Sequence, residues 1–355
     1  MYGEHDYEVL TSAREGLQRQ EDHFGSKQRH DTDGYNIIPF GYCTYRNRSD
    51  DGKFAFNINT ISEKAIVSKF YPVFRFTNAN STFMAEFLNS SPRVKKMLSV
   101  LAVGTSQVVL SFEALKAAKF DLPCKDEQDK IAAFLECLNT RIENQRTLVV
   151  ALKKYKRGVV DGIFSRKLNF SYPQTWAELE ISELFMPISD KGYSDKIVLT
   201  IVQGEGTMPR DSVDRRIAYD KSTISSYKRV LPNDFILHLR SFEGGLEIVN
   251  EEGVVSPAYT ILRARNEIIP LFFYTFFRSY WFINSKLRIS VEGIRDGKSI
   301  NMNTFWHIKV PVPSIEEQRY ISALISSIDN RIKIAEFEYK RLLQIRVGLM
   351  QQLFI

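Results

Sequence analysis

Two stretches of the chain repeat apolar residues in alternating steps of four and three, a spacing that is typical of paired α-helices. The first runs from Ile131 to Ile163 and the second from Ile321 to Leu353. Both interrupt the apolar series at the same step with a basic residue, Lys156 in the first and Arg346 in the second. The pattern predicts two helices, each roughly 60 Å long at about 1.5 Å per residue.

The two stretches are copies of one another. Residues 123–165 align without a gap on residues 313–355, and ten of the 43 pairs are identical. Each copy begins with a proline and a Glu-Gln pair, and Ser314 with Glu317 predicts a capping box at the second start. Two equal helices with matching seams most simply pair with each other in antiparallel fashion. The alternative is that each helix packs separately into one globular core.

The segments between the helices also repeat. "AIVSKFYPVF" from Ala65 is similar to "GVVSPAYTIL" from Gly253, and "FMAEFLNSS" from Phe83 is similar to "FFYTFFRSY" from Phe272. Short β-rich runs mix with one or two helical runs in each copy. We therefore expect an α/β (α+β) protein with an internal repeat of about 190 residues. The expected order is a globular module at 1–122, a helix at 123–168, a second module at 169–312 and a helix at 313–355.

Composition places few limits on the function. The 355 residues carry a net charge of +6 that no single segment dominates, and this mild excess permits an anionic partner without requiring one. Three scattered cysteines argue against a disulfide framework and fit a cytoplasmic location. No secretory signal or membrane-spanning run is recognisable, so we expect no membrane association.

The sequence contains no complete enzyme motif of the kinds considered below. "GIRDGKS" at Gly293 has too short a spacing for a phosphate-binding loop. The chain contains no Pro-Pro, which an adenine methyltransferase motif needs, and "EFEYK" at Glu336 lies on a helix face without a nuclease partner motif. The five histidines show no metal-ligand spacing. We therefore expect no catalytic residues and no metal site.

The doubled unit of proline, Glu-Gln and heptad helix, each copy following a divergent module, resembles the DNA specificity subunit of type I restriction-modification systems. The "VVSPAYTILR" run at Val254–Arg263 adds to the resemblance, which covers about residues 9–355. One departure is that the counterparts of Trp176 and Leu184 would fall before Met1. We therefore expect the first module to lack the opening strand and turn that the family usually has.

The resemblance implies a non-catalytic subunit whose two modules each read one half of a bipartite double-stranded DNA target. It implies that the helices set the spacing of the half-sites and dock two methyltransferase subunits, which would hold the S-adenosylmethionine; this chain would hold no cofactor. Motor-nuclease subunits would join for cleavage. It also implies that the first helical turns face the partners, through Glu127, Gln128, Ile131, Leu135, Glu317, Gln318, Ile321 and Ile325.

Polar and basic residues on the divergent loops are the candidate DNA contacts, because such side chains read base edges and neutralise phosphates. In the first module they are Ser12, Arg14, Gln18, Arg19, Gln20, Tyr45, Arg46, Asn47, Thr105, Ser106 and Gln107. In the second module they are Gln203, Thr207, Arg210, Arg240, Ser241, Arg295, Lys298 and Asn301. The basic pairs Lys95/Lys96, Arg215/Arg216 and Lys228/Arg229 are candidate phosphate contacts or plain charged faces.

Two other interpretations remain open from the sequence. The chain could be a coiled-coil scaffold whose two modules bind proteins, but the module loops are rich in Arg, Gln and Ser rather than in apolar residues. It could also be the recognition part of a fused restriction enzyme or of a related phage-defence methylation system.

Overall fold

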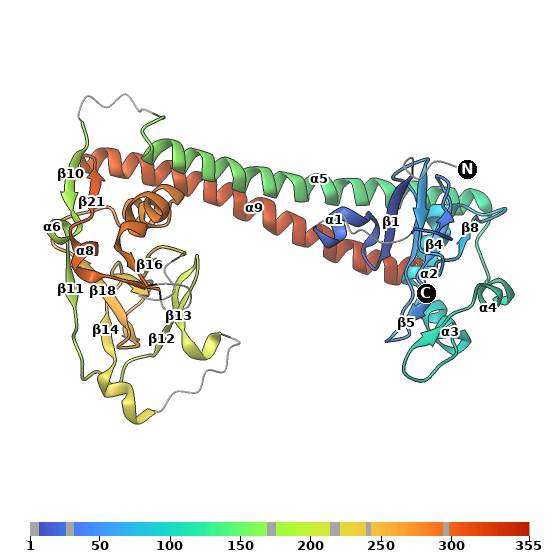
Figure 1. Cartoon of the computed structure of the whole chain (residues 1–355), viewed down its shortest axis with the longest axis horizontal. Helices are drawn as coiled ribbons and strands as arrows, with labels where there is room; N and C mark the ends of the chain where they lie inside the picture. Colours follow the sequence, from blue (N-terminus) through green and yellow to red (C-terminus); the bar gives the residue numbers. More distant parts are fainter. Residues whose placement is uncertain are drawn as a thin grey trace. The chain divides into compact units, whose positions relative to one another are not determined.

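The computed structural model describes residues 7–25, 32–168, 175–213, 221–238, 243–293 and 298–354. The chain forms two compact units. Unit 1 comprises Met1–Thr147 with Glu336–Ile355, and unit 2 comprises Leu148–Ala335. Each unit contains one globular module and half of each of two long helices, α5 (Lys125–Phe164) and α9 (Ile315–Leu353), drawn in green and red in Figure 1. Module 1 denotes residues 7–124 and module 2 residues 165–314.

The two predicted long helices are confirmed, and they pair through the predicted seam. In unit 1, Leu135 near the start of α5 packs with Met350 and Phe354 at the end of α9. In unit 2, Ile163 at the end of α5 packs with Ile321 near the start of α9. The helices are therefore antiparallel. Among the described residues, no helix is both long enough and apolar enough to cross a bilayer.

The basic interruptions of the seam form the same contact in both units. In unit 2 the Lys156 ammonium lies 2.6 Å from the Asp329 carboxylate. In unit 1 the Arg346 guanidinium donates to the Asn139 side chain at 2.8 Å. Arg346 lies 190 residues after Lys156, and Asp329 lies 190 residues after Asn139. The repeat therefore preserves a polar contact across the helix pair. Polar positions of this kind fix the register of paired helices.

Module 1 is built on two small sheets. The first has the order β2-β1-β7-β3 and the second the order β6-β4-β8, with a separate β5-β9 pair. The strands are β1 (Glu8–Ala13), β2 (Gly16–Arg19), β3 (Asn36–Ile37), β4 (Cys43–Tyr45), β5 (Arg48–Ser49), β6 (Phe56–Ile58), β7 (Ala65–Val67), β8 (Val73–Phe74) and β9 (Val108–Val109). The helices are α1 (Gln20–Phe24), α2 (Ser81–Ser90), α3 (Pro92–Leu101) and α4 (Phe112–Ala117).

Module 2 has a four-stranded sheet of order β11-β18-β15-β16 and four two-stranded pairs, β10-β21, β12-β13, β14-β17 and β19-β20. The strands are β10 (Ala177–Glu180), β11 (Phe185–Ile188), β12 (Leu199–Val202), β13 (Gly206–Pro209), β14 (Lys228–Val230), β15 (Phe235–His238), β16 (Glu247–Ile248), β17 (Gly253–Val255), β18 (Tyr259–Ala264), β19 (Val291–Glu292), β20 (Ser299–Ile300) and β21 (Lys309–Val312).

The helical segments of module 2 are α6 (Ile181–Leu184), η1 (Arg210–Ser212), η2 (Lys221–Ser226), α7 (Pro270–Phe277), η3 (Phe282–Lys286), η4 (Leu287–Ser290) and α8 (Met302–Trp306). A set of fully buried phenylalanines fills the core between α7 and the four-stranded sheet, and the ends of α5 and α9 in unit 2 join the same core. Its members include Phe235, Phe272, Phe273, Phe276, Phe277 and Phe282.

Strand pairing shows that the two modules are copies at the level of hydrogen bonds. In module 1, Cys43 pairs with Ile58 and Phe74. In module 2, Phe235 pairs with Ile248 and Leu262. Cys43 therefore corresponds to Phe235, and counting along the strands makes Arg46 the counterpart of His238. The parallel contacts Val9–Ile66 and Val198–Val254 match in the same way.

The modules differ at the edge of the sheet that contains β4 in module 1 and β15 in module 2. In module 2, β18 lies between β11 and β15. In the described part of module 1, its counterpart β8 pairs with β4 alone. Among the described residues, this sheet of module 1 thus has three strands where that of module 2 has four.

Candidate nucleic-acid interface

Module 2 has a surface concavity of about 670 Å³ beside its first hairpin. Its walls come from the β12-β13 hairpin and the segment that follows it, from the end of β15 and from the start of β18. The polar and aromatic residues that line it are Thr200, Gln203, Arg210, His238, Glu247 and Tyr259. We call it concavity 2.

Module 1 has a concavity of about 310 Å³ at the corresponding place, which we call concavity 1. The residues that line it include Thr11, Ser12, Arg14, Arg46 and Tyr71. They come from the β1-β2 hairpin, the residue after β4 and the turn before β8. The same parts of the fold therefore form a polar hollow in both modules.

The strand pairing matches four positions of the two hollows. Counting along paired strands, Thr11 corresponds to Thr200 and Arg14 to Gln203. Arg46 corresponds to His238, and Tyr71 to Tyr259. Each of the eight side chains lines its concavity. The threonine and tyrosine positions are identical, whereas the other two positions carry different polar groups.

The hairpin turn at concavity 2 is held by a buried carboxylate. Glu247 accepts a hydrogen bond from the Gly204 amide at 2.9 Å and pairs with the Arg278 guanidinium at 3.0 Å. Gly206 closes the turn with φ of +84°, and a Cβ there would lie 2.6 Å from the carbonyl oxygen of Ile248, so the position requires glycine. The turn that carries Gln203 is thus fixed by the Glu247 hydrogen bond and by Gly206.

The hairpin at concavity 1 is held by an amide instead. The Asn57 side chain donates to the Ser12 hydroxyl and to the Ala13 carbonyl, both at 2.8 Å. Arg14 on the turn is exposed and pairs with the Asp51 carboxylate at 2.7 Å. Hydrogen bonds from the Ser49 hydroxyl, the Lys53 amide and Arg14 lower the pKa of Asp51 to about 2. The rim of concavity 1 therefore carries charges of both signs at neutral pH.

The wall of concavity 2 combines a histidine and a tyrosine. The rings of His238 and Tyr259 lie 5.3 Å apart between centroids. Burial raises the pKa of Tyr259 above its usual value, so the hydroxyl keeps its proton and can donate a hydrogen bond at neutral pH. The Lys228 ammonium donates to the Tyr259 carbonyl at 2.6 Å, which fixes the backbone at this wall.

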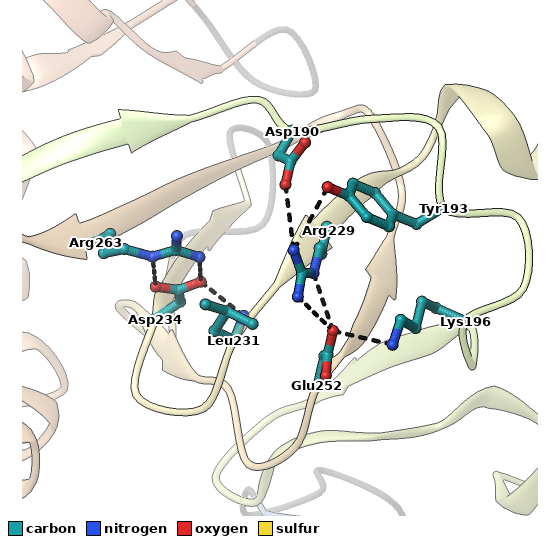
Figure 2. Close-up of polar contacts among 8 residues, drawn as sticks. All are labelled: Asp190, Tyr193, Lys196, Arg229, Leu231, Asp234, Glu252 and Arg263. Carbon is teal, nitrogen blue, oxygen red and sulfur yellow. Dashed lines mark hydrogen bonds and ion pairs between the residues drawn. The ribbon is translucent and has the colours of Figure 1, made fainter.

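The basic pair Lys228/Arg229 belongs to an internal network and not to a free charged face, as Figure 2 shows for Arg229. Arg229 donates to the Glu252 carboxylate at 2.9 Å and lies over the Tyr193 ring. Burial, the largest cause, lowers the pKa of Lys228. The neighbouring Arg263 forms a two-bond contact with Asp234 at 2.8 and 2.7 Å. Of the other pairs, Lys95/Lys96 is exposed on α3, and Arg215/Arg216 lies outside the described residues.

Several predicted DNA contacts are gathered by the concavities. Ser12, Arg14 and Arg46 line concavity 1, and Gln203 and Arg210 line concavity 2. Gln18, Arg19 and Gln20 lie on the second strand of the hairpin and the start of α1 instead of on a loop. Arg240, Ser241 and Arg295 lie outside the described residues.

Two predicted contacts are wrong because their side chains are in the core. Tyr45 is 0% exposed and its hydroxyl donates to the Leu110 carbonyl. Thr207 is 2% exposed and its hydroxyl accepts from the Asn250 amide. Ser12 lines concavity 1, but its hydroxyl is buried and bonded to Asn57. A polar side chain on a short strand pointed inward in each case, which composition alone could not reveal.

The remaining candidates lie elsewhere on the modules. Thr105, Ser106 and Gln107 are exposed, and Gln107 donates to Asp50. Asn47 is half-buried and Lys298 is exposed. Asn301 caps α8 through bonds to the amides of two following residues, so this side chain has a structural role.

The prediction that the Glu-Gln glutamines face partner subunits is also wrong. Gln128 is 4% exposed; its side chain accepts from the Asn80 amide at 3.0 Å and donates to the Pro123 carbonyl at 2.9 Å. Gln318 is 2% exposed and makes the same two bonds, with the Ile269 amide and the Pro313 carbonyl, both at 3.0 Å. We call this contact the glutamine clamp.

The clamp joins each long helix to its own module. Asn80 is the N-cap of α2, and Ile269 is the N-cap of α7. The other expected partner residues are mostly internal as well: Leu135, Glu317, Ile321 and Ile325 are buried, Ile131 is partly buried and Glu127 alone of the eight is exposed. Their burial comes from packing inside each unit, which leaves them unavailable to another chain.

The sequence interpretation missed Tyr71, His238 and Tyr259. The two tyrosines occupy the same position of the aligned runs "AIVSKFYPVF" and "GVVSPAYTIL", so their equivalence was visible without a structure. His238 was not detectable, because its counterpart Arg46 lies 192 residues away and not 190.

The chain matches one protein family over most of its length. Residues 4–152 and 173–344 match the family described as type I restriction modification DNA specificity domain. Two specificity subunits of type I restriction enzymes from Methanocaldococcus jannaschii are similar. MjaX is 24% identical over 224 residues, 58% of this chain and 51% of the relative. MjaVIII is 24% identical over 215 residues, 58% of this chain and 47% of the relative. The matches span about half the length of these relatives.

Solved structures share the fold. The S subunit of a type I restriction-modification system from M. genitalium has a TM-score of 0.53 and 18% identity, covering 100% of this chain and 89% of that one. The HsdS subunit from Thermoanaerobacter tengcongensis has a TM-score of 0.51 and 17% identity, covering 92% and 84%. A chain from a type I R-M complex assembly has a TM-score of 0.55 and 16% identity, covering 90% and 83%.

Proposed function

Because the chain belongs to the family of type I restriction modification DNA specificity domains, we propose that it gives a type I restriction-modification complex its sequence specificity. Each module would read one half of a bipartite double-stranded DNA target. The chain would carry out no chemistry itself. Methylation, with S-adenosylmethionine as the methyl donor, would belong to two partner methyltransferase subunits, and cleavage would belong to motor-nuclease subunits.

The observation that carries this proposal is the pair of matched concavities. A protein that reads two different half-sites needs one scaffold repeated twice with different polar groups at the reading positions. The concavities have this property: the strands around them pair alike, while Arg14 and Arg46 are replaced by Gln203 and His238. Arginine and glutamine are also side chains that form two-bond contacts with base edges.

We also propose that α5 and α9 set the distance between the half-sites and bind the methyltransferase subunits. Each helix continues without a break from one unit into the other. With the first-turn residues buried, other apolar side chains of the helices are the better candidates for partner binding. Those that are exposed include Phe134, Val150, Tyr155, Tyr320, Ile334, Phe337 and Val347.

Mapping methylated bases tests the proposal. DNA would be sequenced from cells that express this chain with the modification subunit encoded beside it, and from cells that express the modification subunit alone. We expect a split motif with a fixed gap that depends on this chain. Methylation that is unchanged without the chain, or a chain that binds only proteins, would overturn the proposal.

A further inference from the structure

Two of the four matched pairs of positions in the concavities carry different side chains, and one of them, Arg46 with His238, adjoins a central strand. Arg46 and His238 each follow a run of buried strand residues. Cys43, Thr44 and Tyr45 are all 0% exposed before Arg46. Phe235, Ile236 and Leu237 are 0–1% exposed before His238. Three successive buried strand residues fix the backbone up to the residue that follows them.

The strands themselves are central in their sheets. β4 pairs with β6 and β8, and β15 pairs with β16 and β18. Neither can shift without breaking ladders on both sides, and side chains on such elements are placed more accurately than side chains on loops. His238 is the last residue of β15 and Arg46 directly follows β4, so both are held by a central strand, whereas the placement of the hairpin residues depends on their turn.

The tyrosine beside this position is held alike in both modules: Tyr259 pairs with His238 across β15 and β18, and Tyr71 is the counterpart of Tyr259. The Tyr71 amide donates to the Ser68 carbonyl at 2.8 Å, and the Tyr259 amide donates to the Ser256 carbonyl at 3.1 Å. Both tyrosines thus leave the same tight turn and face the same hollow. A tyrosine that is the same in both modules cannot distinguish the half-sites, so a difference between them would come from positions that differ, and Arg46 and His238 are next to this tyrosine.

From this geometry we propose that Arg46 and His238 are equivalent specificity-determining residues, each reading a base in one half-site. The inference rests on the proposed function and assigns the reading position within it. An arginine at this place matches the two acceptors of guanine, O6 and N7. A histidine ring N–H matches a single acceptor such as a purine N7. The two half-sites would differ at this position.

The test is a selection of bound sequences from a random double-stranded DNA pool, using the full chain in complex with its modification subunits. The variants are R46A, R46H, H238A and H238R. Lys96→Ala and Arg288→Ala are the matched controls, because both are exposed cations away from the concavities. Thermal melting of each complex checks that the fold is retained, and R46K and H238Q serve where a first variant melts early.

R46A should reduce the preference for one base pair of one half-site roughly 10- to 100-fold, with the other half-site unchanged. H238R should move one position of the other half-site towards guanine, and R46H should lose the guanine of the first. The controls should weaken binding to all sequences evenly, if at all.

Unchanged base preferences in folded R46A and H238A complexes that still bind a split motif would overturn the inference alone. Loss of preference in both half-sites from a single substitution would overturn it too. A wild-type complex that selects no motif would instead overturn the proposed function, so the two failures are distinguishable.

Discussion

The two modules hold their first hairpin at the same joint with different chemistry. In module 1 the joint is neutral: Asn57 bonds the hairpin, and Asn89 bonds the amide and carbonyl of Phe56 beside it, both at 2.8 Å. In module 2 the counterparts are Glu247 and Arg278, which form a buried ion pair. A carboxylate in place of an amide requires a cation beside it, because a lone buried charge is costly.

This difference teaches that the fold tolerates changes of charge where shape and hydrogen bonding are kept together. Tyr274 completes the charged joint by donating to Glu247 at 3.0 Å, and burial raises the pKa of Tyr274 to about 12. The neutral joint needs no third member. Module 2 should therefore be more sensitive to loss of one member of its joint than module 1.

The largest effect is expected from Glu247→Ala. It removes the carboxylate that accepts from the Arg278 guanidinium, the Tyr274 hydroxyl and the Gly204 amide, and leaves Arg278 with the Tyr274 hydroxyl as its acceptor. Breaking a buried ion pair from one side costs about 3 kcal/mol, whereas Asn57→Ala in module 1 should cost about 1–2 kcal/mol. Urea unfolding gives the totals, and hydrogen exchange of β12 and β13 locates the loss. Equal costs in the two modules would contradict the contrast between the joints.

The glutamine clamp is the same in both units. Its loss should therefore lower the free energy of unfolding equally in both, unlike the loss of the two joints. Gln128→Leu and Gln318→Leu each leave one backbone amide and one backbone carbonyl, partly or fully buried, without that partner, at a cost of about 2 kcal/mol. The matched control is Glu127→Leu, one residue away and exposed. Urea unfolding of the three variants compares them. A cost confined to one of the two glutamines, or a control as damaging as the clamp variants, would show that the clamp is not a shared joint.

The smallest effect concerns pH and is confined to module 2. Hydrogen bonds from Arg229 and then Lys196 lower the pKa of Glu252. A carboxyl group with a lowered folded pKa stabilises the fold above its unfolded pKa of about 4.3 and loses that contribution as pH falls through the folded value.

Hydrogen exchange of the β14-β17 pair should therefore accelerate below about pH 4 more in the wild type than in Glu252→Gln, relative to neutral pH. The position of Arg229 is occupied by Ile37 in module 1, where β3 pairs with β7, so that strand pair is the internal control. An identical pH response of the wild type and the variant would show that Glu252 does not contribute to the pH dependence of stability.

The sequence predicted the helices, the repeat and the antiparallel pairing, because a heptad seam and its polar interruptions are periodic and need no alignment of the loops. It failed at single residues for two physical reasons. All three residues of the short central strand β4 are buried, Tyr45 included, and no alternation marks this in the sequence. Helix first turns look exposed by composition, but Gln128 and Gln318 meet backbone groups of their own modules there.

The correspondence of Arg46 with His238 was hidden for a related reason. The helices keep a constant spacing of 190 residues, whereas the hairpins and turns of the modules have gained and lost residues. Phe74 matches Leu262 at a spacing of 188, and Cys43 matches Phe235 at a spacing of 192. Only the hydrogen-bonded register restores the match.

The central claim is that two modules read two halves of one DNA target independently. The direct measurement replaces residues 200–300 with the corresponding module segment of another family member and maps methylated sites in cells that also carry the modification subunit. The account predicts a new sequence in one half-site, with the other half-site and the gap length unchanged. A change in both half-sites, or in neither, with a folded and methylating complex would contradict it.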